Sequence, residues 1–136
     1  MILGIGHDIC DIRRIEAILE RQGERFKERI FTPAERVAAE ASTRQAAFLA
    51  LRFATKEAVY KAFGAYDQQG MGWHDAEIAS KTDKGAPILT LSGKCKTELE
   101  RLLPPNYGAD IHLSLSDEYP YASAYVILAA KPVIDL

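Results

Sequence analysis

The sequence has few cysteines. Cys10 and Cys95 are the only two in 136 residues, and they lie far apart without the spacing of metal ligands. This scarcity argues against a disulfide scaffold and against a zinc site, and it is typical of a reducing compartment. The chain also has no apolar run long enough to span a bilayer, and it begins with a strand pattern rather than a signal peptide. We therefore expect a cytoplasmic protein with no membrane partner.

The chain also lacks an excess of charge of either sign. Its formal net charge is -2, so no overall field favours nucleic acid or an anionic membrane. Basic residues nevertheless gather in the first quarter, interleaved with glutamates: Arg13, Arg14, Arg21, Arg25, Lys27 and Arg29. The simplest interpretation of this cluster is a solvated helix face, and the alternative is a docking strip for an acidic protein partner.

Helical periodicity and capping residues predict most of the helices. Asp11 is a suitable N-cap for a helix that runs to about Gln22 and that Gly23 can end. Thr32 and Pro33 suit an N-cap and a first helical position. The expected helices are residues 12–22, 24–31, 33–41, 43–63 and 93–103.

Strand patterns lie at both ends of the chain and after the longest helix. They cover residues 1–8, a hairpin within 76–93 with its turn at Asp83, Lys84 and Gly85, and two closing strands at 109–116 and 121–130. Strands and helices do not alternate regularly, which argues against a doubly wound parallel sheet. We expect a single α+β domain over residues 1–136, with a mainly antiparallel sheet packed with one long and several short helices.

Asp8 stands at the end of the first strand, directly before the arginines. Gly4 and Gly6 precede it, and glycine inside a strand often marks a close approach of backbone or ligand. A carboxylate at this rim either caps the next helix or binds a metal ion. For Asp11 we favour the cap, and for Asp8 the pattern alone supports both roles equally.

Glu57 and Lys61 lie four residues apart, on one face of the longest predicted helix. A surface ion pair is the simpler explanation of this spacing. The alternative is that Asp8 and Glu57 share a hard divalent cation such as magnesium while Lys61 binds a phosphate. Arg52 and Lys56 are expected to add positive charge nearby.

His112, Ser114 and Ser116 alternate with apolar residues, so one face of that strand should be polar. Such a face is usually solvated, but it could line a nucleotide site with His112 as a donor. A triad of Ser114, His112 and Asp117 is conceivable, although no nucleophile elbow is present. The His7-Asp8 dipeptide is also found in metal phosphohydrolases, but three histidines are too few for such a site.

Three segments, taken together, resemble one family. "GIGHDICDIRRI" is similar to its N-terminal GIGxDIxxxxRI signature, "FLALRFATKEAVYKAFG" to its RFAxKEAxxKAFG helix, and "IHLSLSDEYPYASAYVI" to its closing hairpin. "FTPAE" and "GAPILTLSG" resemble its weaker middle patterns. The chain thus resembles, over essentially its whole length, the holo-acyl-carrier-protein synthases, the small trimeric 4′-phosphopantetheinyl transferases.

This resemblance implies a magnesium-dependent reaction of fatty-acid and lipid metabolism. Coenzyme A donates its 4′-phosphopantetheine arm to a serine of an acyl carrier protein, and adenosine 3′,5′-bisphosphate leaves. The resemblance also implies a homotrimer with active sites at the subunit interfaces. The resemblance implies that Asp8 and Glu57 are catalytic residues that bind magnesium, and that Lys61 is a catalytic residue that contacts the pyrophosphate and so also binds the coenzyme. It implies coenzyme contacts for Arg52, Gly64 and His112. It implies carrier-protein contacts for Arg14, Arg21 and Arg25.

The sequence departs from the family pattern at three places: the loop Ala65 to Gly72 is longer, Asp117 follows "SLS" where histidine is frequent, and His7 replaces a small or apolar residue. Two further functions stay open at this point. One is a catalytically silent trimeric module that binds an acidic partner, and the other is a metal-dependent hydrolase of nucleotide pyrophosphates. Intact Asp8, Glu57 and Lys61 argue against the silent module.

Overall fold

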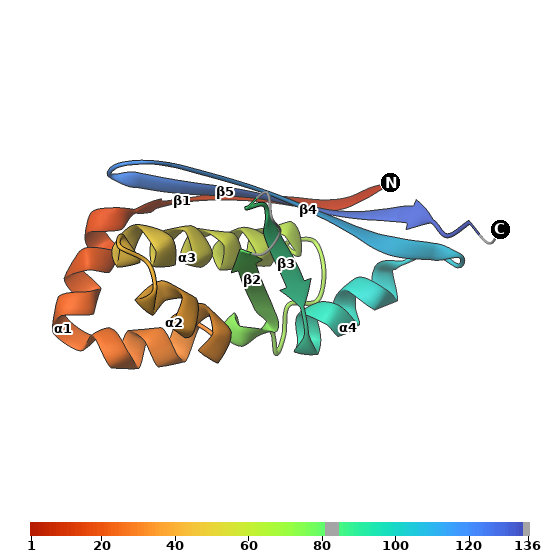
Figure 1. Ribbon diagram of the computed structural model, residues 1–136. Helices are drawn as coiled ribbons and strands as arrows, with labels where there is room; N and C mark the ends of the chain where they lie inside the picture. The colour runs from red at the N-terminus through yellow and green to blue at the C-terminus, as the bar shows by residue number, and fades with distance from the viewer. Residues whose placement is uncertain (81–84, 135–136) are drawn as a thin grey trace.

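The computed structural model describes residues 1–80 and 85–134 (Figure 1). Helices and strands are mixed along the chain, as the sequence predicts. In chain order the elements are β1 (Ile2–Asp11), α1 (Ile12–Ile30), α2 (Pro33–Glu40), α3 (Gln45–Ala62), the 3-10 turn η1 (Trp73–Asp75), β2 (Ala76–Ser80), β3 (Pro87–Leu91), α4 (Gly93–Leu102), β4 (Tyr107–Glu118) and β5 (Tyr121–Pro132).

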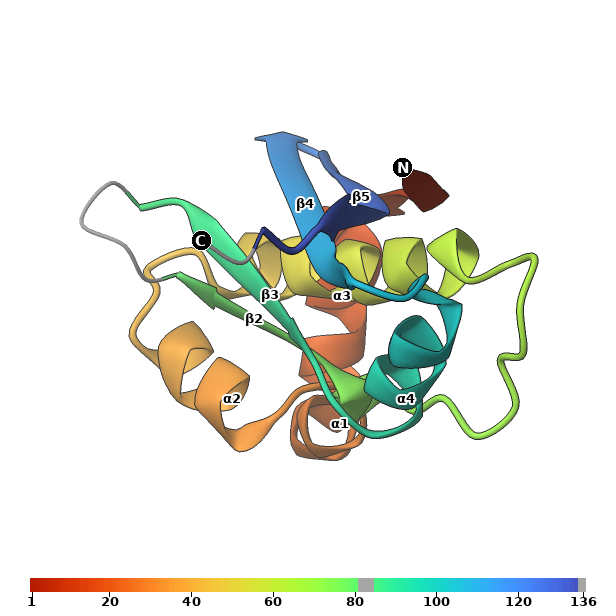
Figure 2. The ribbon, with the colours of Figure 1, turned by 90° about the vertical axis from the view of Figure 1, so that its right-hand side faces the viewer.

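The main sheet has the strand order β1-β5-β4, and both pairings are antiparallel. The hairpin of β2 and β3 forms a second, separate antiparallel ladder. The long helix α3 packs against one face of the main sheet, while α1, α2 and the hairpin lie on the other side of α3 (Figures 1 and 2). The expected α+β class with a mainly antiparallel sheet is therefore confirmed.

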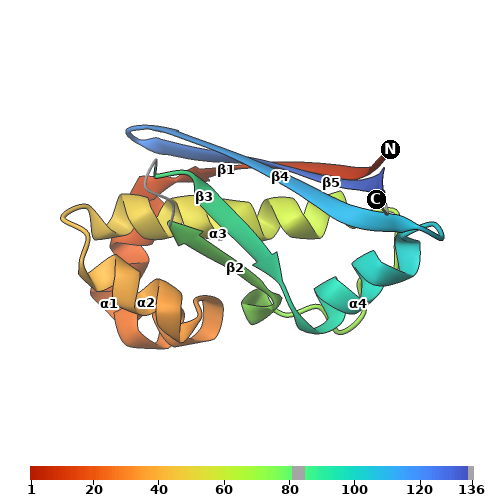
Figure 3. The ribbon, with the colours of Figure 1, turned by 45° about the vertical axis from the view of Figure 1, so that its right-hand side comes forward.

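The outer face of the main sheet is open, since no element of the described chain covers it in Figure 1 or Figure 3. Ile5 and Ile9 of β1 and Tyr125 of β5 are exposed on it, at 60%, 58% and 49% of their surfaces. On β4 this face is polar, with His112 and Ser114 exposed and the alternating apolar residues packed against the core, as predicted.

Two glycines let α3 lie directly on β1. A Cβ atom at Gly4 would stand 2.1 Å from the carbonyl oxygen of Ala62, and one at Gly6 would stand 1.8 Å from that of Ala58. Neither position could hold a side chain without moving the helix or the strand. The sequence signal of close backbone approach is thus correct, and the approaching group is the backbone of α3.

Most predicted boundaries agree with the structure within a few residues. The two helices expected on either side of Gly23 form one element, α1, with a kink where Gln22 has non-helical φ and ψ. The first strand runs three residues beyond its predicted end, to Asp11. The hairpin is present, but Asp83 and Lys84 of its predicted turn lie outside the described residues.

Among residues 1–80 and 85–134, no helix combines the length and the apolar character needed to cross a membrane.

Candidate active site

Asp8 and Lys61 meet where β1 runs over α3. Gly4, Gly6 and Asp8 alternate along the strand, so the Asp8 side chain points to the helix as the two glycines do. The Nζ atom of Lys61 donates to Oδ1 of Asp8 at 2.8 Å and to the carbonyl oxygen of His7 at 3.3 Å. Lys61 therefore reaches across to β1 and pairs with Asp8.

Glu57 lies one helical turn before Lys61, half-buried and close enough to Asp8 to feel its charge. Burial raises the pKa of the Glu57 carboxyl, and the negative charge of Asp8 raises it further, while Lys61 and Arg14 act in the opposite direction. Two carboxylates held this close repel each other, so a positive charge between them is favourable. The structure brings together Asp8, Glu57 and Lys61, the three residues that the sequence singled out.

The donor set suits a hard divalent cation. No cluster of three or more histidine, cysteine or acidic side chains able to hold a metal occurs among residues 1–80 and 85–134. Magnesium does not need such a cage, because it usually keeps several waters and is bound by one or two carboxylates together with substrate phosphates. Asp8 and Glu57 supply two carboxylates at a partly exposed site that a phosphate can enter.

Three exposed arginines of α1, called the arginine strip here, follow Asp8 in the chain, two before the kink at Gln22 and one after it. Arg14, Arg21 and Arg25 are exposed, and no ion pair to another described residue holds any of them. Arg13, in contrast, is tied to Asp11, whose side chain also accepts from the Arg13 backbone as the predicted N-cap. The Arg14 charge acts on Glu57 and lowers the pKa of that carboxyl.

Arg52 and Lys56 do not extend the exposed charge around Lys61, contrary to expectation. Both residues are buried, at 3% and 4% exposure. The Arg52 guanidinium lies over the Phe48 ring, 3.5 Å from its centroid. A coenzyme contact for Arg52 stays a prediction.

His112 and Gly64 lie apart from the carboxylates in the fold. His112 is exposed on the outer face of β4, and its Nε2 lies 3.0 Å from Oδ2 of Asp110 on the same strand. Asp117, the third member of the conceivable triad, pairs with Arg44 instead. Gly64 is exposed directly after the end of α3. The structure gives no support to a triad, and coenzyme contacts of His112 and Gly64 stay predictions.

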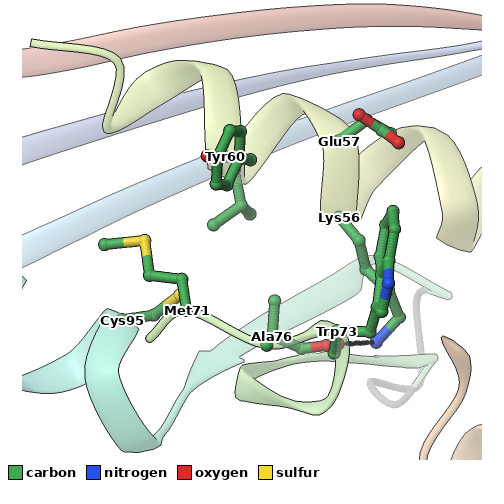
Figure 4. A pocket seen from close by; sticks show the side chains of 9 residues that line it. Lys56, Glu57, Tyr60, Met71, Trp73, Ala76 and Cys95 are labelled. Carbon is green, nitrogen blue, oxygen red and sulfur yellow. Dashed lines mark hydrogen bonds between the residues drawn. The ribbon is translucent and has the colours of Figure 1, made fainter. Parts of the chain in front are cut away.

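An apolar pocket has Glu57 as one of its lining residues (Figure 4). It measures about 260 Å³, and its lining comes from α3, the segment 71–73, β2 and α4. The lining residues are Lys56, Glu57, Val59, Tyr60, Met71, Gly72, Trp73, Ala76 and Cys95. Burial raises the pKa of the Cys95 thiol to about 12, so this cysteine stays protonated and is not a nucleophile.

Sequence reasoning missed this pocket and the residues behind it. Trp73 was not assigned a role, yet it lines the pocket and stacks on Phe53 with ring centroids 5.5 Å apart. Lys56 is expected only to add positive charge near Lys61, but its Nζ lies 2.9 Å from Oε1 of Glu35 in the core. The Thr-x-x-Glu pattern that begins at Thr32 was the one available signal for Glu35, because it marks a capping box.

Comparisons with known proteins agree on one family. A sequence model described as "4'-phosphopantetheinyl transferase superfamily" matches residues 4–124. A holo-[acyl-carrier-protein] synthase of Methylobacterium sp. (strain 4-46) is 48% identical over 130 residues, which cover 96% of each chain.

Solved structures give the same result. The crystal structure of holo-[acyl-carrier-protein] synthase from Neisseria meningitidis matches with a TM-score of 0.81 at 31% identity, over 95% of this chain and 99% of that one. The Helicobacter pylori synthase in complex with coenzyme A matches with a TM-score of 0.74 at 31% identity, over 92% and 99%. The fold described above is therefore shared with enzymes of this kind.

Proposed function

The chain belongs to the 4′-phosphopantetheinyl transferase superfamily, and from this premise we infer that it is a holo-[acyl-carrier-protein] synthase. It transfers the 4′-phosphopantetheine arm of coenzyme A to a serine of apo acyl carrier protein, with adenosine 3′,5′-bisphosphate as the second product. Relatives that carry this name match over nearly the full length of both chains, and one such structure holds coenzyme A.

One observation carries the mechanism: the Asp8 and Glu57 carboxylates and the Lys61 ammonium converge where β1 crosses α3. The transfer forms a bond between the serine oxygen and the phosphorus of the phosphopantetheine phosphate, and it breaks the bond from that phosphorus to the bridging oxygen of the leaving bisphosphate. Charge spreads over the phosphoryl oxygens meanwhile, so the protein mainly positions and neutralises.

Asp8 and Glu57 would hold a magnesium ion at this site. When bound, the ion would supply positive charge that offsets the negative charge of the phosphoryl oxygens. Two partly buried carboxylates next to each other, one with its pKa raised, are a reasonable donor set for such an ion.

Lys61 supplies a second positive charge. Its side chain is 53% exposed, and its ammonium donates to one oxygen of Asp8 and to the His7 carbonyl, which leaves a third donor for a pyrophosphate. The serine must lose its proton during attack. We propose that one of the two carboxylates, Asp8 or Glu57, or a water molecule bound at this site accepts it.

The exposed arginine strip suits an acidic acceptor. Arg14, Arg21 and Arg25 lie along α1, and Arg14 is close to Glu57. A carrier protein with acidic side chains that docks on this strip would present its serine to the carboxylates. Complementary charge of this kind mainly raises the association rate and fixes orientation.

The open sheet face supports a homotrimer. Ile5, Ile9 and Tyr125 form an exposed apolar surface of the kind that marks subunit contacts. We propose that this face is buried between subunits, that coenzyme contacts of Arg52, Gly64 and His112 are completed at these contacts, and that the enzyme serves fatty-acid synthesis in the cytoplasm. Light scattering on purified Tyr125→Arg protein should then give a smaller particle than the wild type.

Intact-protein mass spectrometry of apo acyl carrier protein, after incubation with this protein, coenzyme A and magnesium, tests the central proposal. We expect a mass gain of one phosphopantetheine arm that a chelator abolishes. Absence of any gain with several carrier proteins would favour a silent binding module. Release of adenosine bisphosphate without a gain would indicate a hydrolase.

A further inference from the structure

Lys56 and Glu35 form a buried ion pair that the reaction does not use. Their side chains are 1% and 0% exposed, and the Nζ atom of Lys56 lies 2.9 Å from Oε1 of Glu35. Burial lowers the pKa of Lys56, and the Glu35 charge opposes this change. A buried pair is weak evidence for stability, because desolvation of the charges offsets their attraction. We therefore consider which segments of the chain this ion pair holds in place.

The pair joins four separate segments of the chain. Lys56, on α3, donates to the carbonyl oxygen of Trp73 at 2.8 Å and to that of Ala76. Glu35, on α2, accepts from the backbone N–H of Thr32 and from that of Ile78 on β2, both at 2.9 Å. All three ammonium hydrogens of Lys56 thus have an acceptor, and both oxygens of Glu35 are engaged.

The segment held by Lys56 is the wall of the pocket beside Glu57. Trp73 and Ala76 both line that pocket, and Figure 4 shows Lys56 reaching from α3 toward the Trp73 carbonyl. The Trp73 side chain also lines a shallow groove on α1 that includes Arg25 and Phe26. Trp73 therefore stands between the pocket that adjoins the carboxylates and the surface that carries the arginine strip.

We propose that Lys56 and Glu35 are positioning residues that fix Trp73 and so set the shape of the pocket that receives the organic arm of the donor beside Glu57. This inference rests on the proposed transferase function. Lys56 touches neither the pyrophosphate nor the serine. Its effect passes through the backbone of residues 73–76, so its loss should weaken substrate binding more than it slows the chemical step.

Two variants and one control distinguish an effect on the position of Trp73 from a general loss of fold stability. Lys56→Met alone leaves Glu35 as an unpaired buried charge and should destabilise the fold. Lys56→Met combined with Glu35→Gln removes both charges and should recover part of that loss, yet no donor then holds the Trp73 and Ala76 carbonyls. Leu128→Ala, a fully buried substitution on β5, is the control for general destabilisation.

The readouts are the kinetics of transfer and the fluorescence of Trp73, the only tryptophan of the chain. For the double variant we expect the KM for coenzyme A to rise about tenfold with kcat within about threefold of wild type. We also expect Trp73 to become more accessible to acrylamide. Leu128→Ala should change neither the KM nor the quenching.

Two results would overturn the inference while leaving the transferase function intact. One is a double variant whose KM and quenching equal those of Leu128→Ala. The other is seen in the wild type alone: if coenzyme A with magnesium does not protect Trp73 from acrylamide, the pocket does not receive the donor's arm. This quenching measurement uses only the wild type, so it tests the inference even if both Lys56 variants fail to fold. Lack of transfer by the wild type would instead refute the proposed function.

Discussion

Two lysines of α3, five residues apart, are paired with carboxylates in opposite ways. The side chain of Lys56 is 1% exposed, and every hydrogen of its ammonium meets a protein acceptor. Lys61 is 53% exposed, and its side-chain partner is a single oxygen of Asp8. Five residues correspond to about 140° around a helix, so one lysine faces the core and the other the edge of the sheet.

The difference separates an ion pair that holds structure from one that is available for chemistry. A fully satisfied buried pair cannot exchange partners without a large cost, since removing either charge leaves the other without compensation. An exposed pair contributes little to stability, so a phosphate can replace or join its partner with little loss. Each of the following predictions tests this contrast.

The largest effect is expected at the carboxylates beside Lys61. Asp8→Ala and Glu57→Gln should each lower the transfer rate at least about a thousandfold, equivalent to about 4 kcal/mol of transition-state stabilisation. The exposed Glu100→Gln on α4 is a matched control and should retain the wild-type rate. Mass spectrometry of the carrier protein over time gives the rates. Normal magnesium-dependent activity in either variant would show that the metal is held elsewhere.

Lys56→Met and Lys61→Met should differ in stability. We expect Lys56→Met to lower the free energy of unfolding by about 3–5 kcal/mol, because it leaves Glu35 charged and unpaired in the core. Lys61→Met should leave the urea midpoint nearly unchanged, because exposed ion pairs contribute little. Urea denaturation followed by circular dichroism measures both. Equal losses in the two variants would refute the contrast.

Lys61→Met should have a large effect on activity although its effect on stability is small. Lys61→Met should fold normally but transfer about a hundredfold more slowly, because one positive charge facing the phosphoryl oxygens is lost. Lys61→Arg keeps the charge and should retain more of the rate than Lys61→Met. If the methionine variant transfers as fast as the arginine variant, the ammonium has no role in the reaction.

A smaller effect is expected at the arginine strip. Combined Arg21→Glu and Arg25→Glu should raise the KM for the carrier protein about tenfold, with the KM for coenzyme A unchanged. The rise should be largest at low salt, since exposed charges are screened at higher ionic strength. Lys96→Glu, an exposed reversal on α4, serves as the control. A similar change in that control would mean that the strip does not bind the carrier specifically.

Local patterns in the sequence predict the fold well because they report local physics. The alternation at His112, Ser114 and Ser116 gave the polar face of β4, and Thr32 with Pro33 gave the start of α2. The family motifs gave Asp8, Glu57 and Lys61, which come from two elements that contact each other.

The buried pair could not be predicted in the same way. A lysine on a helix is expected at the surface unless a carboxylate meets it, and Glu35 comes from a helix 21 positions earlier in the chain. The pocket wall depends on the same contact, since Trp73 belongs to a short turn without periodicity. Sequence periodicity carries no information on which distant segment supplies a partner.

The backbone contact at Gly4 and Gly6 has a consequence for protein engineering. Because strand and helix touch there without side chains, the gap between the Asp8 strand and the Glu57 helix is a fixed spacer, independent of how the surrounding core is repacked. Libraries that vary core residues should leave the carboxylate separation unchanged. Alanine at either glycine should lengthen it, and we expect the proposed magnesium site then to favour larger cations, although neither glycine is among its proposed ligands.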